Sequence, residues 1–412
     1  MSAFGCCRHC GEPLTLEFAD LGATPVSNDY LDDVQVKSGE MFYPLRAFVC
    51  QKCRLVQLQD FVASEDMFRE DYAYFSSFST TWLAHAEAYS KRMSARFGLG
   101  AESKVVEIAS NDGYLLQYFK NAGIPVLGVE PSKSVADAAI ADKGVPTEVM
   151  FFGVETAKTL RAAGHAADLM PANNVLAHVP DINDFVGGFR ELLKPEGVAT
   201  FEFPHVLQQI RFNQFDTIYH EHFSYLSLMA VESILKSAGM RAFDTEDLTT
   251  HGGSLRVFAC RADASHEETE NLHRTRKSEA DFGLGEDAVY ADFANKVRQT
   301  KHALLTLLMN LKGQGKTIVG YGAPAKGNTL LNFCGVGRDI LDFTVDRSPH
   351  KQGRFLPGTR LPILAPEAIF EARPDYVLIL PWNLKDEIQD QMAGIRDWGG
   401  KFIVPIPEAT IL

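Results

Sequence analysis

The sequence contains no apolar run near the ~20 residues that a membrane-spanning helix needs, and it does not begin with the basic and then apolar segment of a secretory signal. It also has no excess of positive charge, because 40 lysines and arginines stand against 53 aspartates and glutamates, a net charge of −13. An acidic surface disfavours general binding to nucleic acid or to anionic membranes. These absences predict a soluble, cytoplasmic protein that has neither nucleic acid nor membrane as a partner.

The composition is otherwise ordinary: 46% of the 412 residues are hydrophobic and 23% are charged, so the chain can bury sizeable cores. At roughly 100–200 residues a domain, this length corresponds to two or three domains. Sequence patterns divide the chain into residues 1–70, which hold most of the cysteines, residues 71–312, which end in a long helix, and residues 313–412.

Short apolar runs alternate with helical periodicity in the second and third regions. This alternation predicts α/β units with doubly wound parallel sheets. A polar, acidic stretch at 262–287 leads into the long helix, which ends near Lys312. The predicted strands lie at 104–109, 125–130, 167–170, 198–203, 317–320, 343–346, 376–380 and 402–404.

Cysteine is scarce and unevenly placed, since five of the seven cysteines lie before residue 54 and the count is odd. Both features favour metal binding in a reducing compartment over a disulfide framework. Cys7 and Cys10 form one C-x2-C knuckle, and Cys50 and Cys53 form a second. Four thiolates can close a tetrahedral structural zinc site that has no open position for catalysis. The gap at 11–49 is longer than the ~15–20 residues of a compact zinc ribbon, so unligated buried cysteines are an alternative, and Cys6 competes with Cys7 as a ligand.

The first strand of the middle region carries Glu107 and runs into a small polar turn made of Ala109, Ser110, Asn111, Asp112 and Gly113. Such a turn is where an open α/β sheet binds its cofactor. The sequence has no G-x-G-x-x-G, so a dinucleotide pyrophosphate has no cradle. Glu130 ends the second strand, about twenty residues on, where a carboxylate accepts hydrogen bonds from ribose hydroxyls. These features fit a nucleoside cofactor without a pyrophosphate, S-adenosylmethionine (SAM), although any α/β domain needs similar turns.

A second glycine-containing loop, at 322–329, differs from a phosphate-binding loop in two ways. Lys326 precedes the second glycine instead of following it, and Pro324 removes a backbone donor. ATP hydrolysis is therefore disfavoured, although Lys326 and the loop amides can still face an anion.

The densest group of proton-handling side chains lies at 216–225 and includes Tyr219, Glu221 and His222. The histidines at 220 and 222 are two positions apart, so the H-E-x-x-H pattern of zinc proteases is absent. A general base fits better, because a histidine titrates near neutrality, a neighbouring carboxylate stabilises its cation and a tyrosine can donate to an oxyanion. A helix cap with exposed histidines is the alternative. His178 follows the third predicted strand and either faces the same sheet edge or packs in the core.

Two further segments offer contacts to a substrate. Residues 72–78 interleave aromatic rings with hydroxyls, including Tyr72, Tyr74 and Ser76, and can line a sugar-sized pocket or pack as a linker. His251 lies in a glycine-containing turn before a predicted strand at 255–258, where a purely structural turn is the alternative.

Taken together, the motifs resemble the SAM-dependent C-methyltransferases that act at C-3 of nucleotide-linked 4-keto-6-deoxyhexoses. The resemblance rests on the two cysteine knuckles and on residues 107–113, 173–180, 202–205, 219–225, 251–254 and 320–328, in order over almost the whole chain. It implies an N-terminal zinc-binding module, a central class I methyltransferase domain with a Rossmann-like sheet, and a smaller Rossmann-like C-terminal domain that helps hold the nucleotide sugar. SAM and structural zinc are the implied cofactors.

The resemblance also implies roles for particular residues. His222 removes the C-3 proton, and Tyr219, Glu221 and His178 assist around the keto oxygen and the base. The expected cofactor contacts are Glu107, residues 109–113, Glu130 and Asn173. The expected substrate contacts are Tyr72, Tyr74, Ser76, His251, Lys326 and Asn328.

The implied reaction is chemically coherent. A proton beside a ketone is acidic because its anion spreads onto oxygen, so a base and an oxyanion partner act together. The resulting carbon nucleophile then attacks the methyl group in line with the departing sulfur. Two other functions are possible. A nicotinamide-dependent nucleotide-sugar oxidoreductase or epimerase is disfavoured by the missing G-x-G-x-x-G. A zinc-dependent interaction module would leave residues 219–222 without a role. The sequence fixes neither the nucleotide and sugar nor the oligomeric state.

Overall fold

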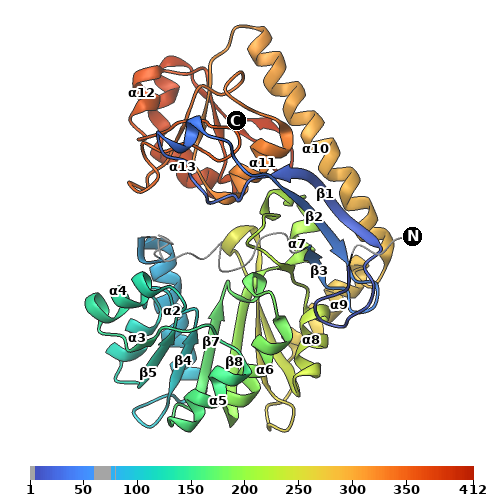
Figure 1. Cartoon of the computed structure of the whole chain (residues 1–412), viewed down its shortest axis with the longest axis vertical. Coiled ribbons are helices and arrows are strands. Elements are labelled where there is room, and N and C mark those ends of the chain that lie inside the picture. Colours follow the sequence, from blue (N-terminus) through green and yellow to red (C-terminus); the bar gives the residue numbers. More distant parts are fainter. Residues whose placement is uncertain (1–4, 60–75, 79) are drawn as a thin grey trace.

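The computed structural model describes residues 5–59, 76–78 and 80–412, and the strands within them form three sheets. We call the parts built on these sheets the N-terminal unit (four strands), the central unit (seven strands) and the C-terminal unit (six strands) (Figure 1). Each sheet takes its strands from one of the three predicted regions, with a single exception in the N-terminal unit. The domain boundaries themselves stay a prediction.

The N-terminal sheet has the order β1-β2-β3-β9, with antiparallel neighbours throughout. Its strands are β1 (Leu16–Thr24), β2 (Tyr43–Val49), β3 (Val56–Leu58) and β9 (Ser224–Tyr225). The exception is β9, which comes from the middle of the chain and pairs with Val56 and Gln57 of β3. In addition, the backbone N–H of Leu58 donates to the carbonyl of Phe223 at 3.0 Å. The N-terminal unit therefore holds the backbone that directly follows His222.

The central sheet has the order β10-β11-β8-β7-β4-β5-β6. Its strands are β4 (Val105–Ile108), β5 (Val126–Val129), β6 (Thr147–Glu148), β7 (Ala167–Asn173), β8 (Leu193–Pro204), β10 (Met240–Leu248) and β11 (Ser254–Arg261). Every residue of β4 and β5 is buried, as in parallel strands with both faces covered. The sheet is parallel as predicted except at one strand, because β11 runs antiparallel to both β8 and β10. The turn between β10 and β11 is too short for the crossover that a parallel pair requires.

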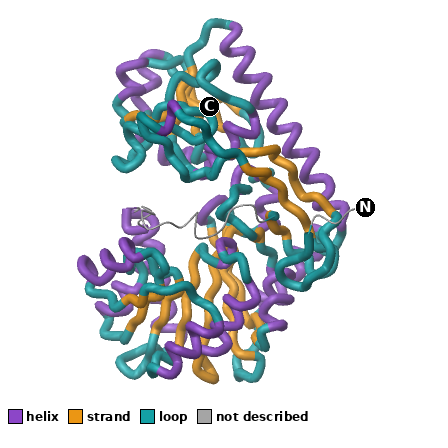
Figure 2. The backbone as a smooth tube through the Cα atoms, viewed as in Figure 1, coloured by secondary structure: helices purple, strands orange, loops and turns teal. Residues whose placement is uncertain are grey.

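Helices pack around the strands of the central sheet (Figure 2). They are α2 (Thr80–Phe97), α3 (Leu116–Asn121), α4 (Lys133–Lys143), α5 (Val154–Ala162), α6 (Ile182–Leu192), α7 (Val206–Arg211), α8 (Leu228–Ser237) and α9 (Glu270–Phe282). The start of α6 is fixed by Asp181, whose carboxylate accepts hydrogen bonds from the backbone N–H groups of Asn183 and Asp184. The polar stretch at 262–287, to which sequence analysis gave no element, contains α9, and Thr269 caps its first turn.

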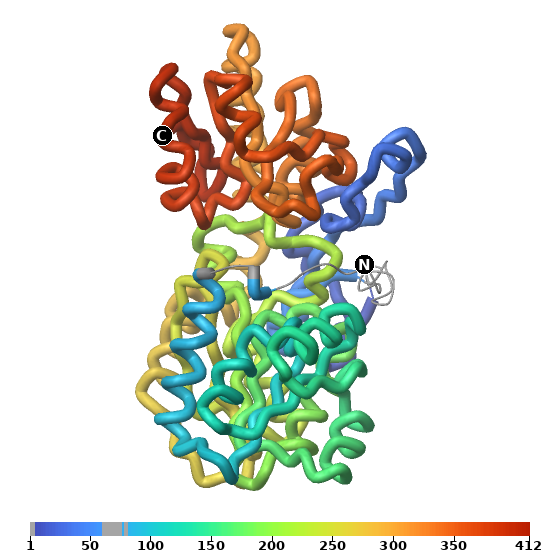
Figure 3. Tube along the Cα trace, turned by 90° about the vertical axis from the view of Figure 1, so that its left-hand side faces the viewer, coloured from blue at the N-terminus to red at the C-terminus, as the bar shows by residue number. Residues whose placement is uncertain are grey.

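The C-terminal sheet has the order β14-β13-β12-β15-β16-β17 and is parallel except for β17. Its strands are β12 (Ile318–Tyr321), β13 (Thr344–Val345), β14 (Ile363–Leu364), β15 (Tyr376–Ile379), β16 (Lys401–Val404) and β17 (Thr410–Ile411), and its helices are α11 (Ala325–Cys334), α12 (Ala368–Ala372) and α13 (Lys385–Gln391). The long helix α10 (Asp287–Gly313) runs from the central unit to the C-terminal unit along one side of the molecule (Figure 1). Figure 3 shows the loop between β1 and β2 beside the C-terminal unit, where the backbones of Leu31 and Phe355 pair.

Two buried clusters bind the units to one another. In the first, β1 packs on α10, with the ring of Phe18 stacked on Phe293 at 4.3 Å between centroids, and the cluster continues into the C-terminal unit. In the second, the cysteine-bearing turns pack with residues of α6 and α8. Among the described residues, none of the helices combines the length and the apolar character needed to cross a membrane.

Candidate active site and metal centre

The carboxyl ends of β4 and β7 carry buried polar atoms that lack hydrogen-bond partners within the described residues. Both carboxylate oxygens of Glu107, Oδ1 of Asn173 and Oδ1 of Asp112 belong to this group. Burial raises the pKa of Glu107 well above its ordinary value. The neighbouring Tyr114 hydroxyl lowers this pKa, and the charges of Asp112 and Glu130 raise it. A buried acceptor without a donor is unfavourable, so this edge of the sheet has the acceptors that a ligand rich in N–H and O–H donors would satisfy.

The turn after β4 adopts an unusual backbone that brings it close to β5. Ala109 and Asn111 have positive φ angles of 56° and 49°, a left-handed conformation that is uncommon for residues with a side chain. The backbone N–H of Asn111 donates to Oε2 of Glu130 at 3.1 Å, and that of Ser132 donates to Oε1 at 2.9 Å. Burial raises the pKa of Glu130. The predicted turn and the second-strand glutamate therefore lie together.

These residues fit the cofactor that the sequence predicts. The ammonium, ribose hydroxyls and adenine amine of SAM are donors, and the orphan oxygens of Glu107, Asp112 and Asn173 are acceptors. Asn173 also donates through Nδ2 to the hydroxyl of Tyr114 at 3.3 Å, which fixes the direction of its unpaired Oδ1. Ser110 adds an unpaired, buried hydroxyl to the same turn.

His222 lies in the loop between α7 and β9 and is 8% exposed. Its Nδ1 lies 2.9 Å from the carbonyl oxygen of Thr217, and its Nε2 lies 2.7 Å from the hydroxyl of Tyr219. A carbonyl can only accept, so Nδ1 carries the proton and Nε2 presents its lone pair to the Tyr219 hydroxyl. Burial lowers the pKa of His222 well below its ordinary value, and His178 and Lys326 add to this effect. The ring is therefore a neutral imidazole at pH 7, with the basic nitrogen already selected.

His178 contacts His222 directly, although the two lie in different segments. Their ring centroids are 4.6 Å apart in an edge-to-face arrangement, and Nδ1 of His178 lies 2.8 Å from the backbone carbonyl of Glu221. Burial lowers the pKa of His178 to about 4. Because His178 closely follows Asn173 at the end of β7, this contact joins the predicted base to the edge that carries the orphan acceptors.

The side chain of Glu221 has a different partner from the one expected. Sequence analysis placed a carboxylate beside the histidine to stabilise its cation, but Oε2 of Glu221 accepts from Nδ2 of Asn28 at 2.7 Å. Adjacent residues of a turn point in different directions, so Glu221 faces the N-terminal unit. Burial raises the pKa of Glu221 to about 7. The group that orients His222 is instead the carbonyl of Thr217.

The predicted substrate contacts fall into three sets. Tyr72 and Tyr74 lie outside the described residues. Ser76 and His251 lie near the cofactor edge, because the backbone N–H of Ser76 donates to Oδ1 of Asn111 at 2.8 Å and Nε2 of His251 lies 3.3 Å from Nδ2 of Asn174.

The other two predicted contacts belong to α11. Lys326 donates through Nζ to Oδ1 of Asn383, and Nζ lies 4.7 Å above the ring of Trp382. Asn328 is 1% exposed, and its amide donates to the carbonyl of Ser27 at 2.6 Å.

Three contributors to this site were not predicted from the sequence. The carbonyl of Thr217 contacts His222, and the amide of Asn28 contacts Glu221. The indole N–H of Trp382 donates to Oδ2 of Asp216 at 2.6 Å. A backbone carbonyl carries no residue-type signal. Asn28 and Trp382 lie 193 and 166 positions from their partners, so no local pattern links them to the site.

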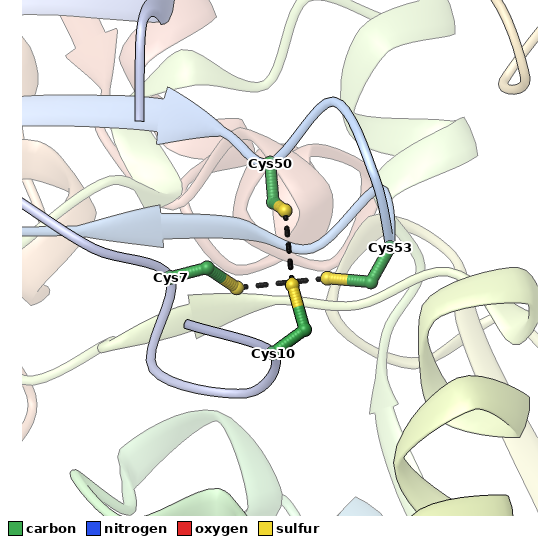
Figure 4. A group of neighbouring side chains, drawn as sticks. All are labelled: Cys7, Cys10, Cys50 and Cys53. Atoms are coloured by element: carbon green, nitrogen blue, oxygen red, sulfur yellow. Dashed lines mark hydrogen bonds between the residues drawn. The ribbon is translucent and has the colours of Figure 1, made fainter. Parts of the chain in front are cut away.

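The four knuckle cysteines converge on one point (Figure 4). Their sulfur atoms all lie within 4.8 Å of one another, with Cys7 and Cys53 at 3.6 Å and Cys10 and Cys50 at 3.4 Å. Four sulfurs at this spacing fit a tetrahedral zinc ion. Cys6 is exposed and outside the cluster. The long gap between the knuckles is explained by β1 and β2, which lie between them and bring the two turns together.

Comparisons with known proteins agree with this arrangement. A C-methyltransferase C-terminal domain matches residues 249–407, a zinc binding domain matches residues 7–68, and a methyltransferase domain matches residues 82–243. The C-methyltransferase NovU of Streptomyces niveus is 36% identical over 406 residues, which cover 98% of this chain and 96% of NovU. Ubiquinone biosynthesis O-methyltransferase of Bartonella tribocorum is 26% identical over 95 residues, 23% of this chain and 38% of that protein.

Solved structures of SAM-dependent methyltransferases also match the chain. One is the 1,6-didemethyltoxoflavin-N1-methyltransferase of Burkholderia thailandensis, with 15% identity, a TM-score of 0.37, and coverage of 52% of this chain and 97% of that one. The extent and identity of the match to NovU decide the family. The chain is therefore a SAM-dependent enzyme with SAM and zinc as its cofactors, and it belongs to the family of C-methyltransferases that its motifs resemble.

Proposed function

We propose that this enzyme transfers a methyl group from SAM to C-3 of a nucleotide-linked 4-keto-6-deoxyhexose. The observation that carries the proposal is the environment of His222: a buried, neutral imidazole whose Nδ1–H is held by the Thr217 carbonyl and whose Nε2 lone pair faces a tyrosine hydroxyl. A base of this kind suits the removal of a carbon-bound proton beside a ketone, which is acidic only while the developing charge on oxygen is stabilised.

Each of the four predicted catalytic residues has a distinct role in this proposal. Nε2 of His222 accepts the C-3 proton once the hydroxyl of Tyr219 turns from Nε2 to the keto oxygen, where it donates to the developing oxyanion. His178 packs its ring edge-to-face with that of His222 and limits its rotation. Glu221, with a pKa raised to about 7 by burial, is partly protonated at neutral pH, and its bond to Asn28 ties the turn that carries the base to the N-terminal unit.

The cofactor contacts follow from the orphan acceptors. Glu107 and Asn173 receive N–H donors, and residues 109–113 form the turn against which the cofactor lies. Glu130, whose two oxygens each accept one backbone N–H already, accepts the ribose hydroxyls in addition. When bound, SAM supplies an electrophilic methyl group on a sulfonium. The protein's part is to orient the substrate carbon and to keep water from the base. Cys7, Cys10, Cys50 and Cys53 hold zinc in a structural site, and their thiolates require the reducing conditions of the cytoplasm.

The sugar nucleotide is placed by groups around the same edge. Lys326 offers a cation to the diphosphate, and Ser76 and His251 offer polar contacts to the sugar. Tyr72 and Tyr74 remain substrate contacts predicted from the sequence and lie outside the described residues. The acceptor class rests on chemistry, because a base and an oxyanion donor serve carbon methylation of a ketone and are unnecessary for methylation of an amine.

The experiment has two parts. The enzyme is incubated with SAM and with TDP-, GDP- and CDP-linked 4-keto-6-deoxy sugars, and mass spectrometry is used to look for the gain of one methyl group. The His222→Asn variant is then compared by calorimetric titration of SAM and by turnover. We expect unchanged SAM affinity and a loss of turnover of at least about 100-fold.

The control is His220→Asn, in the same turn. The ring of His220 contacts Tyr43 and the Pro44 carbonyl of the N-terminal unit, so this variant is expected to keep its turnover. A fully active His222→Asn enzyme would refute the role of the base, and the absence of any methylated keto sugar would refute the acceptor class.

A further inference from the structure

Helix α11 of the C-terminal unit presents two consecutive buried polar residues to the other units. Asn328 is 1% exposed and Thr329 is fully buried. A threonine hydroxyl inside a helix commonly bonds back to the carbonyl four residues earlier. The hydroxyl of Thr329 instead donates across the unit boundary to the carbonyl of Ile218, at 3.0 Å. Both side chains therefore make contacts that the helix itself does not need.

The bond from Thr329 lies one residue away from the carbonyl that orients His222. Ile218 follows Thr217, whose carbonyl accepts from Nδ1 of His222 at 2.9 Å. On the other side of Thr217, the carboxylate of Asp216 accepts from the indole N–H of Trp382 at 2.6 Å. The C-terminal unit therefore contacts the residues on both sides of Thr217, through the side chain of Asp216 and the backbone carbonyl of Ile218. With its neighbours fixed, the Thr217 carbonyl can point in only a narrow range of directions.

The bond from Asn328 likewise lies one residue away from the group that contacts Glu221. Nδ2 of Asn328 donates to the carbonyl of Ser27 at 2.6 Å. The next residue, Asn28, donates through its own Nδ2 to Oε2 of Glu221 at 2.7 Å. The hydroxyls of Ser27 and Thr329 also lie 3.4 Å apart, so the two chains of contacts adjoin.

We propose that Asn328 and Thr329 are positioning residues, through which the C-terminal unit sets the ring orientation and tautomer of His222 and the direction of the Glu221 carboxyl. This inference rests on the proposed function. It gives Asn328 a role between units in place of the substrate contact that the sequence predicted. Neither residue touches the reacting atoms. Each acts through one backbone carbonyl, on a group that contacts a catalytic side chain.

The primary test compares Thr329→Val, which removes the hydroxyl at nearly constant shape, with Thr329→Ser, which keeps it. The full chain is labelled with 15N-histidine, and the tautomer of His222 is read by NMR, with its signals assigned by their loss in His222→Asn. We expect the Nδ1–H tautomer in the wild type and in Thr329→Ser, and a mixture of tautomers in Thr329→Val. Turnover of Thr329→Val should fall about tenfold with SAM affinity unchanged, and Thr329→Ser should restore it.

Thr275→Val serves as the matched control. The hydroxyl of this buried threonine donates to the carbonyl of Asn271 within α9 and lies 2.8 Å from the hydroxyl of Thr245, so the substitution removes a buried threonine hydroxyl that has no bond to the segment around His222. An unchanged tautomer in Thr329→Val, whether or not turnover falls, would overturn the positioning role. A changed tautomer with full turnover would instead contradict His222 as the base, and so the proposed function, while the positioning contact would stand.

Asn328 is tested by a double-mutant cycle with Asn28. If Asn328 acts on Glu221 through Asn28, then Asn328→Leu adds little to the loss of turnover already caused by Asn28→Ala, because both break one chain of contacts. Effects that simply add would contradict the pathway through Asn28.

Discussion

At the scale of single residues, the site separates two groups that the sequence places side by side. Glu221 and His222 are consecutive, yet the carboxyl of Glu221 faces Asn28 and the imidazole of His222 faces Tyr219 and the Thr217 carbonyl. Burial acts on both in the direction of the neutral form, since it raises the pKa of Glu221 to about 7 and lowers the pKa of His222. The resting site therefore holds an uncharged base and a partly protonated acid that face opposite partners.

This burial makes the stability contribution of Glu221 depend on pH. The pKa of Glu221 is about 7 in the folded chain against an ordinary value of 4.5, so between these values the folded state keeps a proton that the unfolded state has released. Wild-type stability therefore decreases as pH rises through this window. Glu221→Gln cannot titrate, and its Tm relative to wild type should rise by about 3 °C between pH 5 and pH 8.

Differential scanning fluorimetry at both pH values measures this difference. The exposed Glu102 gives the matched control, because Glu102→Gln makes the same change of charge on the surface and should leave the Tm difference nearly independent of pH. An equal Tm difference for Glu221→Gln at the two pH values would show that the carboxyl is ionised in the folded protein.

At the scale of elements, β5 supports the cofactor turn through a glycine. A Cβ on Gly128 would lie 2.4 Å from Oγ and 3.0 Å from Cβ of Ser110, and 2.9 Å from Oγ1 of Thr147. Ser110 stands between Ala109 and Asn111, both of which have positive φ angles. The hydroxyl of Ser110 can rotate away from an added methyl group, but its Cβ cannot, so the turn has to shift by a few tenths of an ångström at the cofactor edge.

We expect Gly128→Ala to weaken SAM binding about tenfold, because the clash displaces Ser110 and with it the turn at 109–113. Calorimetric titration of SAM measures this change. The control is Gly285→Ala, at a position where an added Cβ meets no atom within 4 Å, and it should bind SAM as the wild type does. Normal SAM affinity in Gly128→Ala would mean that the turn after β4 does not contact the cofactor.

Periodicity predicted the buried central strands of the two larger sheets and the long helix α10, and it missed the strands of the N-terminal sheet and several strands at sheet edges. Each of the nine predicted strand runs coincides with a strand, since most of their side chains are apolar and buried. The two-residue strand β9 gave no such signal, because Ser224 and Tyr225 become a strand only through pairing with β3. The direction of β11 likewise follows from the short turn after β10, and not from its own residues.

At the scale of the whole molecule, the candidate site draws on all three units. His222 and its partners lie in the central region, Asn28 in the N-terminal unit, and Thr329 and Trp382 in the C-terminal unit. The sequence could indicate His222, Glu221 and the cysteine knuckles, because their chemistry shows in short motifs. It could not indicate the Thr217 carbonyl or Asn28, whose roles exist only once distant segments are packed together.

The metal centre connects the N-terminal unit to the candidate site, so its removal has consequences beyond that unit. The cysteine turns pack against α6 and α8, and β3, which begins shortly after Cys53, pairs with the strand that follows His222. Arg8, inside the first knuckle, donates to the carbonyl of Pro180 at 2.9 Å and lies over the ring of Phe223. Loss of zinc should therefore release residues close to both His178 and His222.

We expect one zinc ion per chain, and we expect a chelator to lower the Tm by more than about 10 °C and to abolish turnover, with recovery on adding zinc. Thiol titration gives a readout independent of activity: roughly one thiol, the exposed Cys6, reacts in the native protein, and four more react after chelation.

Cys6→Ser should keep the zinc and Cys7→Ser should lose it, because the sulfur of Cys7 lies inside the cluster and that of Cys6 does not. If Cys7→Ser keeps the zinc and Cys6→Ser loses it, the ligand is Cys6 and not Cys7. If the thiols stay unreactive after the metal is removed, packing alone holds the knuckles closed.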